Sequence, residues 1–207
     1  MDYVINDDCI IFNDNFNKIL DNKIINDIKK VKNVYFGKYF NQNIDNLPDN
    51  VKIIRFGKKD VWNLRGCYFD KPIDNLPCHL EELYLGSEFN QNLDFLPYSL
   101  KKLHLDRCYE KPLNNLPRSI VELEIGEYYK FPIQHLQVKK LIVSADYLKI
   151  PYAERIPLIL IKNFDEICEN NNKIFDLFPE LPRNIEKLGI VIHRYGKRKI
   201  ITIDIKN

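Results

Sequence analysis

The sequence predicts a right-handed solenoid of mostly β or α/β class, with a parallel β-sheet along one face, about nine short coils and few helices. One observation is a repeated phrase, because FNQNIDNLP at 40–48 returns as FNQNLDFLP at 89–97. A second is that apolar residues recur at fixed positions of a unit of about 20 residues. A third is that two of these positions lie two residues apart, which is the spacing of a strand with one buried face.

The clearest copies of the unit begin at Val31, Leu80, Leu100 and Ile120. A further copy begins at Val51 if an insertion of about nine residues is allowed near KDVWNLRGC. One such strand cannot bury its apolar face alone. Stacking the units pairs the strands in parallel and turns each apolar position into a continuous row.

The rows are counted from the first apolar residue of each unit. Positions four and six form the buried face of the strand, position ten is aromatic, and positions fourteen and seventeen are aliphatic. Position four holds Val34, Ile54, Leu83, Leu103, Leu123 and Leu141, and position ten holds Phe40, Phe69, Phe89, Tyr109 and Tyr129. Proline usually follows the leucine at position seventeen, and its fixed φ suits a turn into the next strand. The polar residues of the phrase, Asn90, Gln91 and Asn92, are expected to face outward or to form loops.

The ends of a solenoid need caps, because an open end exposes the interior and a strand edge. We expect a single repeat domain over 1–207, with an N-terminal cap at 1–30, regular repeats at 31–143, and degenerate repeats with a C-terminal cap at 144–207. The segment 165–178 is predicted to be a short helix or an irregular insertion. The segment 190–205 is predicted to be a hairpin that turns at RYGK.

The phrase FNQNI…LP and the strand LEELYLG resemble the FNIP repeat, a leucine-rich-repeat-like unit of social amoebae and of giant viruses that infect amoebae. The resemblance covers 31–143 well, and 7–30 and 181–192 loosely. The units are shorter here, and the proline of the family's NxP[IL] pattern is kept in some units and replaced by asparagine in others. The prolines are Pro72, Pro112 and Pro132, and the asparagines are Asn43 and Asn92.

Function is expected on the outer side of the sheet, where positions three, five and eight point away from the core. Tyrosine and arginine are enriched at binding hot spots, so these positions predict a protein-binding face. The predicted partner-binding residues are Tyr35, Arg55, Tyr84, Lys102, His104 and Glu124, together with Trp62 in the insertion. The alternatives are that the row only stabilises an exposed sheet through cross-strand pairs, and that Trp62 folds back over the coil.

Other classes of function find little support. The pairs Cys78–His79 and His104–Cys108 fall on different sides of the unit, so no metal site is expected. No nucleophile, phosphate-binding or metalloprotease motif is present, so we expect no enzyme and no cofactor. The net charge of +2 offers no broad basic field, and the basic run at 193–199 fits a hairpin turn, so nucleic acid is not expected as a partner.

The predicted function is therefore recognition of another protein. A structural or self-assembling protein, virion-associated if the source is viral, is the first alternative, and it would form homo-oligomers. The second is a substrate-recognition adaptor for ubiquitin ligation, which some viral relatives resemble, although no F-box is evident here. No signal peptide or transmembrane segment is expected, which predicts the cytoplasm, or the host cytoplasm or virion if the protein is viral.

Overall fold

The computed structural model describes residues 2–57, 66–126, 129–131, 138, 140–144, 158–162, 187–194 and 197–204. In these residues the strands form one 11-stranded sheet whose spatial order follows the sequence. The strands are β1 (Tyr3–Asn6), β2 (Cys9–Phe12), β3 (Asn33–Phe36), β4 (Ile53–Phe56), β5 (Glu82–Tyr84), β6 (Lys102–His104), β7 (Glu122–Glu124), β8 (Lys140–Ser144), β9 (Leu158–Lys162), β10 (Lys187–Arg194) and β11 (Lys197–Asp204). One described helix, α1 (Asn22–Ile28), lies between β2 and β3.

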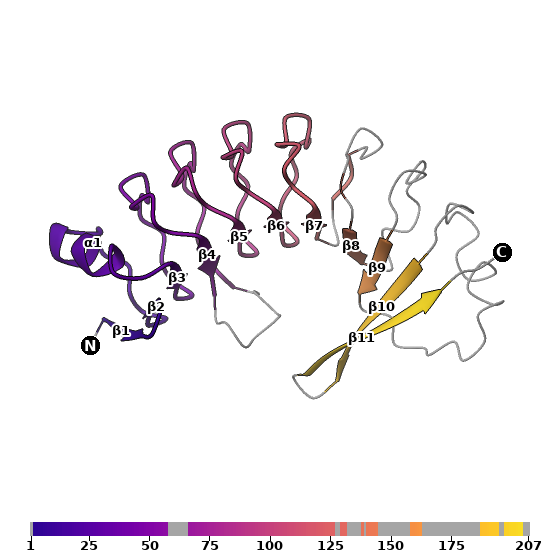
Figure 1. Ribbon diagram of the computed structural model, residues 1–207, viewed down its shortest axis with the longest axis horizontal. Helices are drawn as coiled ribbons and strands as arrows, with labels where there is room; N and C mark the ends of the chain where they lie inside the picture. Colours follow the sequence, from indigo (N-terminus) through magenta and orange to yellow (C-terminus); the bar gives the residue numbers. More distant parts are fainter. Residues whose placement is uncertain are drawn as a thin grey trace.

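Strands β2 to β10 run parallel, and each pairs with the next strand along the chain. The two end strands, β1 and β11, pair antiparallel with their neighbours. Figure 1 shows an arch in which the strands line the lower, concave side and the connecting turns lie on the convex side. The predicted parallel sheet and solenoid arrangement are confirmed. The expected count of about nine coils is not, because the structure supports about five turns.

The predicted repeat positions are in register from strand to strand. Position four runs from Val34 through Ile54, Leu83, Leu103 and Leu123 to Leu141, each paired with the next. The aromatic residues at position ten form a second row inside the solenoid. Their rings stack at centroid distances of 5.9 to 6.3 Å from Phe16 through Phe40, Phe69, Phe89 and Tyr109 to Tyr129. These rows make up the core, as the spacing predicted.

The asparagine of the repeated phrase has a structural role that the sequence analysis missed. The backbone N–H of Asn41 donates to Asn17 Oδ1 (2.9 Å), and that of Asp70 donates to Asn41 Oδ1 (3.0 Å). The series continues from Asn90 N–H to Asp70 Oδ1 (2.9 Å) and from Glu110 N–H to Asn90 Oδ1 (3.0 Å). Position eleven therefore links each coil to the next, a role that the expectation for Asn90 as an outward or loop-forming residue did not include.

The turns between coils account for the recurring proline and for Gly37. The carbonyls of Pro48, Pro77, Pro97 and Pro117 each accept a 3.1 Å hydrogen bond from the N–H three residues later, where the next unit begins. Gly37 follows β3, and a Cβ there would overlap the backbone carbonyl of Asn13 in the preceding coil. The coils can approach this closely only because Gly37 has no side chain.

The N-terminal coil is closed by α1, whose N-cap Asp21 accepts a 2.9 Å hydrogen bond from Ile24 N–H. Ile24 and Ile28 are the buried residues of this helix. No described helix is long and apolar enough to span a bilayer.

At the other end, β10 and β11 form the predicted hairpin, with Arg194 paired to Lys197. Its turn residues, 195 and 196, lie outside the described residues. The expected helix or insertion at 165–178 and the predicted partner-binding residue Trp62 lie outside them as well.

Candidate protein-interaction face

Position five forms a polar and aromatic row on the side of the sheet opposite the core. Strand pairing sets Tyr35 beside Arg55, Arg55 beside Tyr84, Tyr84 beside His104, and His104 beside Glu124. These are five of the predicted partner-binding residues. The parallel register brings them together although they come from separate repeats. We call them the position-five row.

The row is a continuous series of side-chain contacts from β4 to β7. The Arg55 guanidinium carbon lies 4.8 Å from the centroid of the Tyr84 ring, which is a cation–π distance. The Tyr84 and His104 rings lie 6.0 Å apart, and His104 Nδ1 lies 3.0 Å from Glu124 Oε2. The arrangement fixes the orientation of each side chain by its neighbour on the next strand.

The position-five row is less accessible than the sequence analysis expected. The exposed fraction is 7% for Tyr35, 6% for Arg55, 6% for His104 and 5% for Glu124, whereas Tyr84 is half-buried. Adjacent strands lie only about 4.8 Å apart, so long side chains at neighbouring positions cover one another. Tyr84 is therefore the most accessible member, with its hydroxyl 2.7 Å from Glu82 Oε2. Burial and this hydrogen bond raise the pKa of Tyr84, so its hydroxyl stays protonated.

Position three provides a row of alternating charge beside the position-five row. Glu82, Lys102, Glu122 and Lys140 lie on successive strands β5 to β8. Lys102 Nζ lies 2.7 Å from Glu82 Oε1, and Lys140 Nζ lies 3.0 Å from Glu122 Oε2. The hydrogen bond that Lys102 donates to Glu82 raises the pKa of Lys102, which keeps the lysine charged. The predicted residue Lys102 is 41% exposed at its side chain, so this row is open to a partner.

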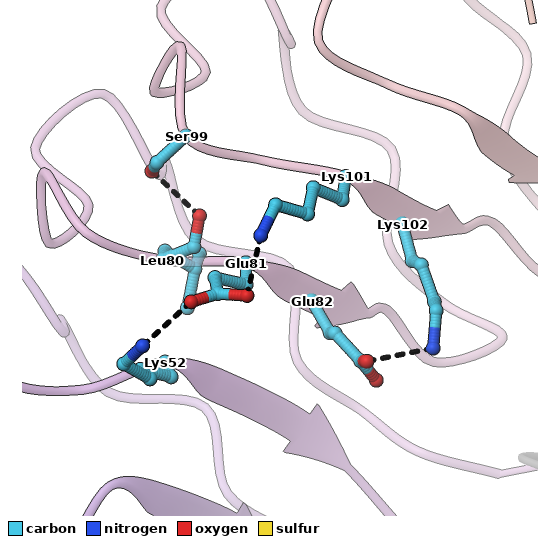
Figure 2. Close-up of polar contacts among 7 residues, drawn as sticks. All are labelled: Lys52, Leu80, Glu81, Glu82, Ser99, Lys101 and Lys102. Atoms are coloured by element: carbon cyan, nitrogen blue, oxygen red, sulfur yellow. Dashed lines mark hydrogen bonds and ion pairs between the residues drawn. The ribbon is translucent and has the colours of Figure 1, made fainter.

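A second charged row borders the sheet at position two, and Figure 2 shows its centre. Glu81 accepts from Lys52 Nζ (2.6 Å) and from Lys101 Nζ (2.8 Å), one lysine on each carboxylate oxygen. These two ammonium groups lower the pKa of Glu81 to about 2. The same view shows Ser99 Oγ donating to the Leu80 carbonyl at 2.6 Å. On this border, a charged side chain of one coil therefore pairs with an opposite charge on the neighbouring coil.

Two exposed tyrosines were missed by the sequence analysis. Tyr39 and Tyr68 occupy position nine of adjacent units and are 43% and 48% exposed. Their rings stack at 5.3 Å, and Lys38 Nζ lies 5.1 Å from the first centroid and 5.9 Å from the second. The signal in the sequence was the recurrence of tyrosine at this position. A Cβ at Gly66, which ends the insertion containing Trp62, would contact the Lys38 side chain.

The described residues offer no cluster of three or more histidine, cysteine or acidic side chains that could hold a metal ion. Cys9, Cys67, Cys78 and Cys108 are free thiols. Burial raises the pKa of Cys67 to about 11, which disfavours its reactive thiolate. Cys78 lies in a turn, where its backbone N–H donates to Asp49 Oδ1 at 3.1 Å.

Comparison with known families gives one match. Residues 29–59, 69–108 and 89–128 match the family model described as FNIP Repeat. These segments contain β3 to β7, the strands that carry the position-five row. No curated protein matches the chain.

Proposed function

Because this is an FNIP-repeat protein, we propose that it is a protein–protein interaction module that binds its partner through the outer face of the sheet and performs no catalysis. The observation that carries the proposal is a contrast between two neighbouring positions of the same strands. Position four is always Val, Ile or Leu from Val34 to Leu141, whereas position five changes from tyrosine to arginine, tyrosine, histidine and glutamate. A position that served only to build the sheet would not need this change of chemical group between neighbouring coils.

The accessible part of this face has a defined chemistry. It combines the half-buried Tyr84 with the partly exposed charges of Glu82, Lys102 and Glu122. A partner that matches it needs charges of the opposite alternation, set at the spacing of the strands, and an apolar or hydrogen-bonding group over Tyr84. Since each side chain is held by a neighbour, binding would order few additional groups and would cost little conformational entropy.

The test is a variant in which every charge of the position-three row is exchanged: Glu82→Lys, Lys102→Glu, Glu122→Lys and Lys140→Glu. Alternation along the row is preserved, so each ion pair can re-form with its partners exchanged. We expect the melting temperature to stay near that of the wild type. We also expect the variant to lose the proteins that the wild type retains from a lysate of the organism that encodes it, as measured by affinity capture and mass spectrometry.

The matched control is the double variant Phe95→Ala with Tyr98→Ala on the convex side. These residues are 67% and 89% exposed and belong to the same coil as Glu82. It should retain the same proteins as the wild type. If the charge-exchanged variant folds and still retains them, or if the wild type retains nothing specific, the proposal fails.

We propose further that the right-handed coil continues past β7 to about nine coils. Strands β8, β9 and β10 support this extension, because they pair in the same parallel order as the strands before them.

A further inference from the structure

We propose that this protein assembles end to end, with β1 of one copy paired in parallel with β11 of the next. The proposal goes beyond binding at the sheet face, because it uses the two edges of the sheet and a second copy of the same chain.

The N-terminal edge of the sheet is open and apolar. Strand β1 pairs with β2 on one side, and in the described part of the chain no strand pairs with its other side. Val4 and Ile5 are 46% and 43% exposed. Edge strands are commonly protected by lysine, proline or a bulge. Tyr3–Asn6 contains neither residue, and its pairing with β2 is uninterrupted from Tyr3↔Phe12 to Asn6↔Cys9.

The strand at the opposite edge, β11, runs in the direction that it needs to pair in parallel with β1. Among the described residues, β11 pairs only with β10. Both β1 and β11 are antiparallel to the strands between them, so they point the same way. A second copy placed at the end of the first, in the same orientation, would set β11 beside β1 as parallel neighbours. This is the pairing used throughout the interior of the sheet, from β2 to β10.

The acids that flank β1 are complementary in charge to the basic start of β11. The acids Asp2, Asp7 and Asp8 flank β1, and the basic residues Lys197, Arg198 and Lys199 begin β11. A register that sets Tyr3–Asn6 beside 200–203 brings Asp2, which also pairs with Lys18 (2.9 Å), beside Lys199, and it brings Asp7 beside Asp204. An antiparallel pairing of β1 with β1 that sets Val4 opposite Ile5 would instead bring Asp2 opposite Asp7 at both ends of the contact, so both of its charge pairs would be like-charged and destabilising. The edges therefore favour β1 with β11 over β1 with itself.

Two properties of the assembly follow. The contact joins different surfaces of the two copies, so it leaves a free β1 at one end and a free β11 at the other, and further copies can add. Because attraction between opposite charges contributes to the contact, added salt weakens it.

The first experiment is sedimentation velocity of the full chain at low salt over a wide range of concentration. The average mass of the wild type should rise with concentration. Ile5→Lys, which places a lysine on the open edge, should sediment as a monomer. Tyr98→Lys, at an 89% exposed position on another coil, should associate like the wild type. A wild type that stays monomeric throughout, or an Ile5→Lys variant that associates as the wild type does, overturns the proposal.

A second pair of variants identifies the two edges and does not depend on Ile5→Lys folding normally. Asp2→Lys and Lys199→Glu should each reduce association when alone. Mixed in equal amounts they should associate in alternation, because β1 of the Asp2→Lys variant and β11 of the Lys199→Glu variant carry opposite charges and the other contact between the two variants is that of the wild type. A mixture that associates no more than its components overturns the pairing of β1 with β11. Capture of a partner by the Ile5→Lys variant is measured in parallel. Loss of self-association with partner capture retained separates this proposal from the sheet-face proposal.

Discussion

At the scale of single residues, the repeated phrase separates into core residues and residues that join the coils. Phe89 is 1% exposed and stacks on Phe69 at 6.1 Å and on Tyr109 at 6.3 Å. Asp70 accepts hydrogen bonds from Asn90 N–H and from Gln91 Nε2, both at 2.9 Å. The aromatic part was predictable, because a recurring aromatic in an apolar pattern indicates the core. The polar part was not, because the acceptor role of position eleven requires knowledge of how far apart neighbouring coils lie.

We predict that Phe89→Ala lowers the free energy of unfolding by about 3–5 kcal/mol, because it removes a buried ring from the stack. Urea denaturation measures this change. Phe95→Ala in the same coil is the control. Its ring is 67% exposed, so its effect should stay within about 0.5 kcal/mol. Equal effects of the two substitutions would contradict the assignment of the core.

We predict that Asp70→Ala lowers the free energy of unfolding by about 1–3 kcal/mol, because it leaves two donors without their acceptor. Asp70→Asn keeps an oxygen at the same place, as Asn41 and Asn90 do in the neighbouring coils, and should retain most of the stability. Thermal or urea unfolding of the two variants distinguishes them. An Asn variant as unstable as the Ala variant would show that the charge of Asp70, rather than its hydrogen bonds, is what matters.

At the scale of the elements, short strands are held in register by side chains as well as by the backbone. Glu81 joins the coils of β4, β5 and β6 through Lys52 and Lys101. At position three, ion pairs do the same between β5 and β6 and between β7 and β8. The sequence predicted the strands and their order, because the period of two and the repeat length are properties of the pattern. It did not predict these ion pairs, because the register that sets Glu82 beside Lys102 appears only once the strands are paired.

We predict a pH dependence of stability from Glu81. Its pKa is lowered from 4.5 to about 2 in the folded protein, so its contribution to stability is fully present above pH 4.5 and is lost as the pH falls toward 2. The melting temperature of Glu81→Gln should therefore fall below that of the wild type at neutral pH, and the difference should shrink across this window. A difference that stays constant down to the lowest pH would contradict the ion pairs, and added salt should reduce the difference at neutral pH.

At the scale of the whole molecule, constant positions build the solenoid and variable positions give it a particular outer face. The sequence predicted which residues form the position-five row, since parallel strands bring equivalent positions together. It did not predict that Arg55, His104 and Glu124 would be nearly covered, because this depends on how long side chains pack across neighbouring strands. The accessible residues of this face are therefore Tyr84 and the charged residues beside it. The tyrosine pair of Tyr39 and Tyr68 adds an exposed surface outside that row.

The most direct test of the central claim is hydroxyl-radical footprinting of the chain with and without its captured partner. The method measures oxidation of individual tyrosines, and this chain has tyrosines both on the sheet face and in the turns. Tyr84 is half-buried on the sheet face, whereas Tyr98 is 89% exposed in a turn on the convex side. We predict that the partner reduces oxidation of Tyr84 and leaves oxidation of Tyr98 unchanged. Protection of Tyr98 with unchanged oxidation of Tyr84 would contradict it.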